Sequence, residues 1–271
     1  MRDTDRHSEL QIPGSRFHVA VVFALPAEFS LWRARHAFRR ISLSRHRPAG
    51  AADPAPPVPQ ATFEAQIDDV PVRVAFSGVG APNAQAMEET VFAARPGVVI
   101  VAGAAGGLKP RYRCGDIIVA EQLQAAVDGR IISIENRLLS AAARCGATVA
   151  GLLLTVDRMV LRADDKAALG RTADAVDMES FVVVSEAARH GIPAVAIRVI
   201  ADTVEEDLPL DLTSAIRPDG TISAPRAALH AVSRPARWPA LVRAGLSYRR
   251  ALGELARFLD RFVSSLSSAA L

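Results

Sequence analysis

The sequence has 271 residues, of which 50% are hydrophobic and 23% are charged. This apolar content is enough to bury one large core and excludes a disordered protein. The chain has only two cysteines, Cys114 and Cys145, which excludes a scaffold held by disulfides. The formal charge is +3 and aromatic residues make up 5% of the chain. A nucleic-acid surface needs basic and aromatic side chains interleaved, so we expect no nucleic-acid partner.

The first 16 residues are charged and polar and contain no signal-peptide core, so we expect a disordered lead and a cytoplasmic protein. No apolar stretch reaches the roughly 18 residues that span a bilayer. One domain over residues 17–271 is the expected organisation.

A continuous apolar run over residues 17–25 predicts a strand buried on both faces, and Pro26 ends it. A helix over residues 27–40 and a proline- and alanine-rich loop over residues 47–60 follow. The elements predicted after the loop are, in chain order, strands at 61–67 and 72–76, a helix at 82–94, strands at 98–102 and 117–120, a helix at 136–145, a strand at 152–156, a helix at 178–190 and a strand at 194–200. Strands that alternate with helices predict an α/β fold.

The remaining part of the chain has a different pattern. Residues 205–225 contain turn signals, including Pro218-Asp219-Gly220, and a helix is predicted over 235–262 within a helical tail at 226–264. Apolar residues can line one face of this helix, namely Leu241, Leu252, Leu255, Leu259 and Phe262. Arginines cover much of the rest, namely Arg243, Arg249, Arg250 and Arg257. The pattern is typical of a surface helix packed on the core and also of a helix that contacts a membrane surface.

Two glycine-rich segments, residues 77–80 and 103–107, each follow an apolar run. Glycine at a strand end allows a tight turn or the close approach of a ligand, and the sequence alone leaves both readings open. The dinucleotide-binding pattern of three glycines is broken at Asn83, which argues against a NAD-dependent enzyme.

Two carboxylates are predicted at the same edge of the sheet. Glu28 follows the first strand, and Asp202 follows the strand at 194–200. Ligands of open α/β sheets bind beyond the carboxyl ends of the strands, so the two suit acid and base roles. Arg198 lies inside the same strand as Asp202 and needs a buried partner. Glu179, in the first turn of a predicted helix, fits either the helix dipole or a binding role.

Metal ligation is not indicated by the sequence. The histidines show no ligand spacing with one another or with the cysteines, so we expect no metal and no cofactor.

Two motifs carry a family resemblance. Residues 176–202 contain Val-Asp-Met-Glu at a helix start and then a strand that ends in Arg-x-x-x-Asp, and residues 98–119 contain Ala-Gly-Gly-Leu-x-Pro followed by Gly-Asp-Ile-Ile-Val. With these motifs the chain resembles the nucleoside phosphorylase and methylthioadenosine/adenosylhomocysteine nucleosidase superfamily over residues 17–209. The tail resembles the hopanoid-associated phosphorylase branch through residues 202–209, 218–220 and 234–262.

The resemblance implies a three-layer αβα fold around a mixed, partly closed sheet. It also implies release of a purine base from C1′ of a ribose, without a cofactor, by a hydrolase or by a glycosyl-transferring phosphorylase that uses inorganic phosphate as co-substrate. The branch implies adenosylhopane as substrate, cleaved to adenine in hopanoid biosynthesis. The partners implied are a small purine nucleoside and a second copy of the chain, with peripheral membrane contact through the tail.

The resemblance also implies roles for individual residues. Asp202 protonates N7 of the base, with its pKa raised by burial, and Glu28 activates the attacking water or contacts the nucleophile. Arg198 lies near Glu28 and the nucleophile. The residues implied to bind ribose or base are Ala105, Gly106, Met159, Val160, Met178 and Glu179.

The chain departs from the family pattern at two kinds of position. Ala104 and Ala201 stand where the nucleosidases usually carry serine. The Gly-Asp-Pro-Gly-Arg loop of the hexameric phosphorylases is missing, and their Arg-x-x-Ser strand end would fall at Val101 and Ala104. Hydrolysis and phosphorolysis therefore both stay open. So do a methylthioadenosine/adenosylhomocysteine or futalosine nucleosidase, and a nucleoside-binding protein without turnover.

Overall fold

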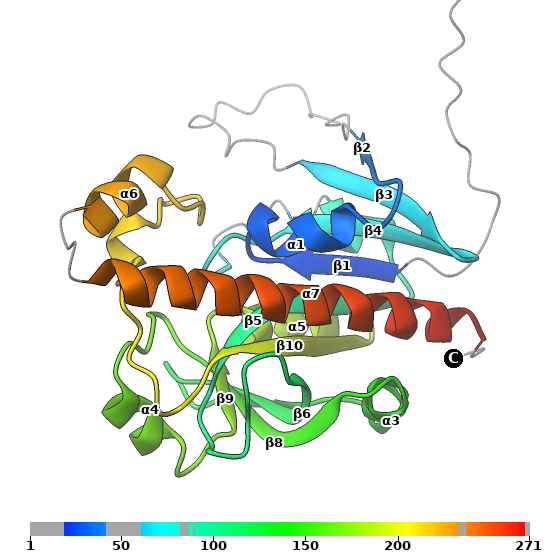
Figure 1. Ribbon diagram of the computed structural model, residues 1–271. Helices are drawn as coiled ribbons and strands as arrows, with labels where there is room; N and C mark the ends of the chain where they lie inside the picture. The colour runs from blue at the N-terminus through cyan, green and yellow to red at the C-terminus, as the bar shows by residue number, and fades with distance from the viewer. Residues whose placement is uncertain (1–18, 42–60, 82–86, 89, 233–236, 269–271) are drawn as a thin grey trace, which may run out of the picture.

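The computed structural model describes residues 19–41, 61–81, 87–88, 90–232 and 237–268. The predicted lead at 1–16 and the predicted loop at 47–60 lie outside the described residues. Helices and a central mixed sheet form the α/β architecture expected from the sequence (Figure 1). The organisation into a single domain over 17–271 stays a prediction.

The N-terminal strands pair side by side. Strand β1 (Val19–Phe23) is buried along its whole length and pairs in parallel with β4 (Val70–Phe76) and β5 (Val98–Gly107). Strand β3 (Thr62–Ile67) pairs with β4 in antiparallel fashion. The strands predicted at 61–67 and 72–76 are thus confirmed with slightly different bounds.

The helix predicted over 27–40 is wrong in its second half. Helix α1 (Pro26–Arg33) is shorter, and β2 (Arg39–Ile41) pairs with β3. Phe38 explains the early end, because its ring packs on Phe29 at a centroid distance of 4.8 Å after the chain has turned back. This aromatic contact outweighs the helical propensity of the alanine- and arginine-rich segment.

Further along, the structure adds elements that the sequence patterns did not predict. Of the helix predicted at 82–94, residues 82–86 and 89 lie outside the described residues, and Phe92–Ala94 forms the 3-10 helix η1. The predicted elements that the structure confirms with revised bounds are β6 (Ile117–Ala125), α3 (Asn136–Arg144), β8 (Thr148–Thr155), α5 (Ser180–Arg189) and β10 (Ala194–Asp202). The elements not predicted are β7 (Ile131–Ser133), α4 (Ala163–Leu169), β9 (Ala175–Asp177) and the 3-10 helix η2 (Thr213–Ala215).

The second glycine segment is part of a strand. Residues 103–107 extend β5 beyond the predicted end at Ala102. Residues 103–106 pair with β10 on one side, and Gly106 and Gly107 pair with β9 on the other. The tight turn considered for this segment is therefore wrong, whereas the close approach of a ligand stays a prediction. Small residues here leave room for charged side chains from other strands, as the site below shows.

The sheet is partly closed. Strand β10 pairs with β5 in parallel and with β6 in antiparallel fashion, and β6 continues through β8 and β9 back to β5. These five strands form a ring, and β1, β4, β3 and β2 extend outward from β5. Strands β1, β4, β5 and β10 are parallel, so their carboxyl ends lie at one edge.

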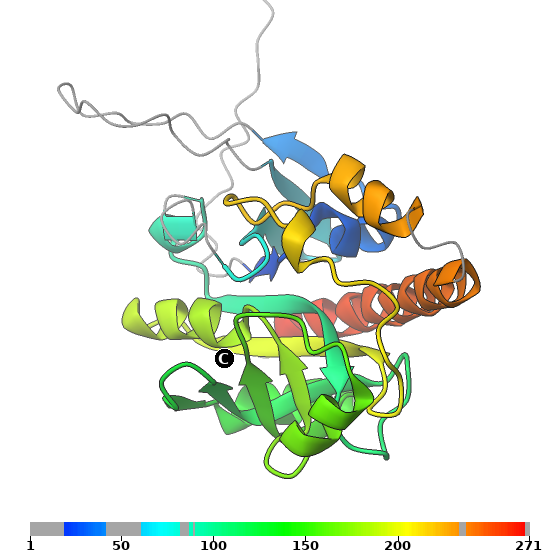
Figure 2. The ribbon, with the colours of Figure 1, turned by 90° about the vertical axis from the view of Figure 1, so that its left-hand side faces the viewer.

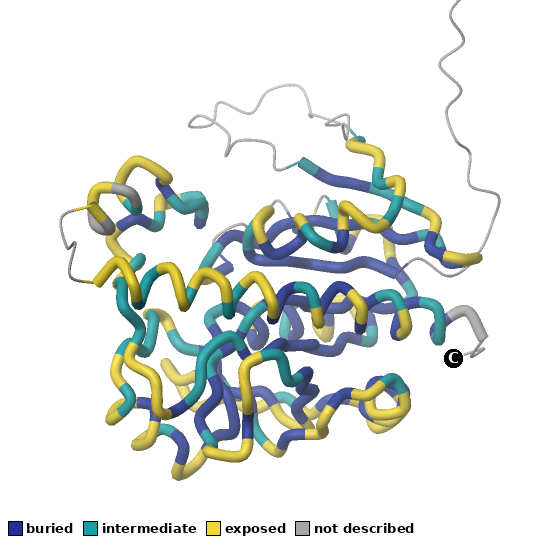
Figure 3. Tube along the Cα trace, in the orientation of Figure 1, coloured by how far each residue is buried: buried dark blue, intermediate teal, exposed yellow. Residues whose placement is uncertain are grey.

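Helices cover both faces of this sheet. Helix α7 (Trp238–Ser268) lies with α1 on one face of β5 and β10, and α5 lies on the other (Figures 1 and 2). The three layers confirm the fold class. Figure 3 shows that the C-terminal half of α7 is buried on its inner side, whereas its N-terminal half, next to α6 (Ala224–Val232), is exposed or half-buried. None of the described helices has the length and apolar character needed to cross a membrane.

Candidate active site

The carboxylate of Glu28 is fixed at the edge where β1 ends. Proline at the start of α1 and Glu28 in its first turn favour the helix start. Glu28 Oε2 accepts hydrogen bonds from the backbone N–H groups of Ala24 and Leu25, at 3.0 and 3.1 Å. Oε1 accepts one from Ala104 N of β5, at 2.9 Å. Burial raises the pKa of Glu28, against the nearby charge of Arg198 and these amides.

Arg198 is the buried cation of the site, with 1% of its side chain exposed. Its Nη2 lies 2.5 Å from Asp177 Oδ2 and 3.5 Å from Glu179 Oε2, as ion pairs whose geometry is not that of aligned hydrogen bonds. Its Nε donates to Ser180 Oγ at 3.0 Å. Burial disfavours the charge, but the surrounding carboxylates outweigh it and raise the pKa of Arg198. The partner required by its position in a central strand is therefore Asp177.

Glu179 lies at the N-terminal end of α5 and faces the first glycine segment. Its Oε1 accepts a hydrogen bond from Gly80 N at 3.1 Å. Burial raises the pKa of Glu179 to about 8, and the negative charges of Asp177 and Glu28 add to this while Arg198 opposes it. Stabilisation by the helix dipole was one explanation for a carboxylate at this position. It does not by itself explain why the Glu179 carboxylate lies between Gly80 and Arg198.

Asp202 ends β10 and has a cation of its own. Lys166 Nζ of α4 donates to Asp202 Oδ2, and the ammonium group is buried. Burial raises the pKa of Asp202, and Lys166 opposes the rise. This direction agrees with the one expected from burial, and the role of Asp202 as proton donor stays a prediction.

Two glycines of β5 lie directly against these charged groups. A Cβ on Gly103 would lie 2.3 Å from Arg198 Nη1 and 2.7 Å from Glu28 Oε1, so any side chain would displace both. A Cβ on Gly106 would lie 3.3 Å from Asp202 Oδ2. Ala104 contacts Glu28, and Gly106 pairs with Asp202. These two residues of β5 are two positions apart, or about 7 Å along the strand. Glu28, Arg198 and Asp202 therefore all border residues 103–106.

The structure gives fewer contacts between the apolar residues expected at the site and its charged groups. Ala105 is buried in β5, and half-buried Met178 directly follows β9. Val160 packs on a cluster that includes Val176, whose Cγ1 would lie 3.2 Å from a Cβ on Gly106. Met159 is half-buried in the segment between β8 and α4, and no contact links it to the carboxylates among the described residues. Roles for these four residues stay predictions.

Sequence reasoning missed three polar residues of this network. Asp177 accepts from Thr155 Oγ1 at 2.7 Å and from Ser180 N at 3.0 Å, in addition to its ion pair. Its place in the Val-Asp-Met-Glu motif could have indicated it. Lys166 is one of only two lysines, and this rarity was the only signal for it. Tyr248 of α7 is close enough to Glu28 and Glu179 that, after burial, their charges raise its pKa well above the usual value.

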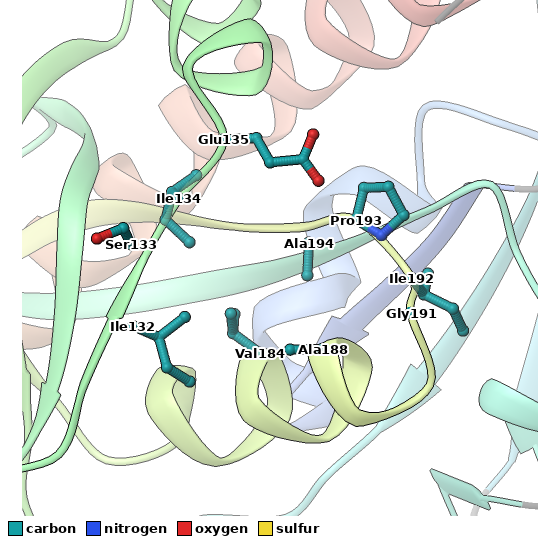
Figure 4. Close-up of a pocket in the computed structure, with 10 residues that line it drawn as sticks. All are labelled: Ile132, Ser133, Ile134, Glu135, Val184, Ala188, Gly191, Ile192, Pro193 and Ala194. Carbon is teal, nitrogen blue, oxygen red and sulfur yellow. The ribbon is translucent and has the colours of Figure 1, made fainter.

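A hollow in the structure lies away from these carboxylates. A cavity of about 270 Å³ is lined by residues of β7, α5 and the start of β10, including Ile132, Glu135, Val184 and Ala194 (Figure 4). Ala194 begins β10 and Asp202 ends it, about 26 Å apart along an extended strand. This cavity is therefore separate from the carboxylates.

One surface group brings metal-binding atoms together among the described residues. Ligand atoms of Glu88, Glu186 and His190 lie within 4.8 Å of one another. His190 Nε2 lies 2.7 Å from Glu88 Oε2, so a direct contact between the imidazole and this carboxylate accounts for the arrangement. The histidine spacing had not indicated this cluster, because Glu88 comes from a different part of the chain.

Known proteins share this architecture. Residues 54–232 match the family described as the phosphorylase superfamily. A methylthioadenosine/adenosylhomocysteine nucleosidase from Neisseria meningitidis, solved with methylthio-immucillin-A, is 21% identical with a TM-score of 0.64, covering 92% of this chain and 99% of that one. A futalosine hydrolase mutant of Helicobacter pylori is 17% identical with a TM-score of 0.63, covering 92% and 99%. At these identities the two structures support the fold.

Proposed function

Because the chain belongs to the phosphorylase superfamily, we propose that it cleaves the N-glycosidic bond of a purine nucleoside and releases the base. The observation that carries the proposal is the placement along β5 of Glu28 and Arg198 against Gly103 and of Asp202 against Gly106, with Glu179 beside Arg198. Cleavage of this bond needs a proton for the leaving base and negative charge for the sugar, and the site offers both.

In the proposed reaction, the bond from C1′ to N9 breaks and its electron pair stays on N9. Asp202 donates a proton to N7, and the sugar passes through an oxocarbenium-like state. Glu28 accepts a proton from the attacking water. Burial raises the pKa of both carboxyl groups, which brings them toward the range where proton transfer is efficient. Glu179 is suited to accept hydrogen bonds from the ribose hydroxyls.

The substrate that we propose is a 5′-substituted adenosine, with adenosylhopane as the first candidate. The support is the tail. Its helices α6 and α7 place apolar side chains in water, and those exposed by half or more are Leu229, Val232, Trp238, Val242 and Leu246. Such a surface suits a bulky apolar 5′ group more than a small polar one.

A methylthioadenosine/adenosylhomocysteine or futalosine nucleosidase is the second candidate. The likeness to solved nucleosidases favours it, although Ala104 and Ala201 lack the hydroxyls usual at these positions. The nucleophile is a separate question. Glu28 favours water, and inorganic phosphate is the alternative co-substrate that the assay must include.

Partners follow from the same surface. The segment from residue 220 to residue 253 contains six arginines and no acidic residue. Together with exposed Trp238, Val242 and Leu246, spaced four residues apart on α7, this favours peripheral contact with an anionic membrane. Neutralising Arg243, Arg249 and Arg250 should abolish sedimentation with anionic liposomes. Unchanged sedimentation would exclude membrane contact through this face. Assembly with a second copy is also proposed and is measured by light scattering.

The deciding experiment measures adenine by chromatography after incubation with adenosylhopane or methylthioadenosine, each with and without phosphate. We expect release from adenosylhopane, and Glu28→Gln should bind the nucleoside without turnover. Release from methylthioadenosine alone would assign the chain to the second candidate. Tight binding by the wild type without release from any nucleoside would refute an enzymatic role.

A further inference from the structure

Lys166 is a buried charge whose contacts are all defined. It lies in α4 beside the segment that follows β10 (Figure 1) and has none of its surface exposed. Its ammonium group donates to Asp202 Oδ2, to the carbonyl oxygen of Thr203 at 3.1 Å and to that of Glu206 at 2.7 Å. A lysine ammonium has three hydrogens, so all of them are used. A buried ammonium group is tolerated only when paired in this way.

We propose that Lys166 is a positioning residue for proton transfer, which holds Oδ2 of Asp202 and leaves Oδ1 to meet the departing purine. This role rests on the proposed glycosidic cleavage. Oδ2 is the oxygen that Lys166 contacts, whereas no hydrogen bond to Oδ1 occurs within the part of the chain that the structure describes. The Asp202 side chain keeps 17% of its surface exposed, so the carboxyl group is not sealed off from a ligand.

The proton balance of the step follows from this geometry. The proton moves from Oδ1 of Asp202 to N7 of the base, as the electron pair of the C1′–N9 bond passes to N9. The carboxylate that remains is balanced by the Lys166 ammonium, which keeps its three hydrogens throughout. Burial raises the pKa of Asp202 and Lys166 lowers it, so the two act against each other on the strength of the acid.

The other titratable groups that face this pair are few among the described residues. Glu206 raises the pKa of Asp202 through its negative charge, and the thiol of Cys114 is in turn affected by both acids and by Arg250. Within the described part of the chain, Lys166 alone supplies positive charge directly to Asp202. Removing that charge should therefore shift the titration of Asp202 in one direction, toward higher pH.

Lys166 also has a structural role, because it ties the segment 203–206 to α4. The experiment must separate this role from the electrostatic one. Lys166→Met removes the charge with nearly the same shape, whereas Lys166→Arg keeps the charge. Lys109→Met is the matched control, because Lys109 is the other lysine of the chain and also anchors α4, through the carbonyl of Gly170.

Two readouts are used on the full chain. The first is the pH dependence of kcat for adenine release. Because Asp202 acts in its protonated form, activity falls as the pH rises through its pKa, and in Lys166→Met this fall should move to higher pH with at least about a tenfold loss of kcat. Lys166→Arg should keep the fall near its wild-type position, and Lys109→Met should change neither. An unmoved profile in Lys166→Met would overturn the proposal.

The second readout does not need turnover. Carbon-13 NMR of labelled aspartate, with Asp202 identified by its loss in Asp202→Asn, follows the carboxyl titration directly. An unmoved titration in Lys166→Met would overturn the proposal even in an active enzyme. A moved titration in a protein that releases no base from any nucleoside would refute the proposed function and the proton-transfer role together. If Lys166→Met does not fold, Lys166→Gln provides an uncharged donor for the same titration.

Discussion

Glu179 should lower the stability of the folded protein at neutral and alkaline pH. Its pKa is raised by burial from 4.5 to about 8, so the folded protein resists its ionisation while the unfolded chain does not. A raised folded-state pKa contributes stability below pH 4.5 that is lost as the pH rises to about 8. At about 1.4 kcal/mol per pKa unit, the loss across this window is at most about 5 kcal/mol.

Glu179→Gln removes this titration and keeps the size of the side chain. At pH 5, where Glu179 is protonated, the variant and the wild type should have similar free energies of unfolding. At pH 8.5 the variant should be more stable by a few kcal/mol, because glutamine remains neutral. A gain in stability on removing Glu179 would fit its proposed role in binding, because functional sites are often retained at a cost in stability.

The assay is urea unfolding followed by far-UV circular dichroism at half-unit steps from pH 5 to pH 8.5. Glu254→Gln is the control, because Glu254 is about half exposed in an ion pair with Arg257. It should show a difference from wild type that does not change with pH. The reasoning fails if the difference for Glu179→Gln is also constant, or if the variant becomes the less stable protein at pH 8.5.

Three further outcomes follow from the contacts of the site. Asp202→Asn should lower kcat for adenine release by about 10²- to 10⁴-fold in the chromatographic assay, and a change below about threefold would exclude it as the general acid. Gly103→Ala should lower both activity and the urea midpoint, because its Cβ would lie 2.3 Å from Arg198 Nη1. Gly245→Ala, with no atom within 4 Å of its Cβ on α7, should raise the midpoint instead, and equal effects of the two would contradict the argument. Arg198→Met should cost about 3–5 kcal/mol of unfolding free energy by leaving buried carboxylates without their cation, and a cost under about 1 kcal/mol would show that the cation is dispensable.

The sequence predicted those parts of the fold in which local pattern and tertiary packing agree. The strands β1, β8 and β10 are apolar runs that the sheet buries, and α5 is amphipathic and ends at Arg189, shortly before Gly191 with its positive φ. Residues 103–107 were misjudged because glycine has low strand propensity. A tertiary contact explains the glycine at position 103, because Gly103 lies against Arg198 of β10. No local sequence pattern reveals this contact.

The candidate site was predictable where a residue follows a buried strand. Glu28 and Asp202 stand at such positions, and the parallel pairing of β1, β5 and β10 brings their ends to one edge. Lys166 and Tyr248 were not predictable, because each reaches the site from a helix distant in sequence. The direction of a side chain across such a distance depends on packing, which periodicity does not encode.

The charges of the site fall into two groups with different consequences for the proposed reaction. In the first group, the charges of Glu28 and Glu179 raise the pKa of Arg198, and the charge of Glu28 raises that of Glu179. In the second group, the pKa of Asp202 is lowered by the charge of Lys166 and raised by that of Glu206. The first group has more carboxyl groups than cations. Because the pKa values of Glu28 and Glu179 are raised, their ionisation is unfavourable in the free site, and an added positive charge would make it more favourable. An oxocarbenium-like sugar supplies that charge, so the feature that destabilises the free protein would favour the transition state over a neutral substrate.

The second group is a balanced pair and can transfer a proton without disturbing the first. If the two groups are independent, the effects of Glu179→Gln and Lys166→Met on the free energy of activation should add in the double variant within about 0.5 kcal/mol. The comparison is made on kcat at one pH, with each single variant measured beside the double. A larger deviation would mean that protonation of the base and stabilisation of the sugar are coupled through one network. The division of the site into a cation-favouring cluster and a separate proton donor would then be wrong.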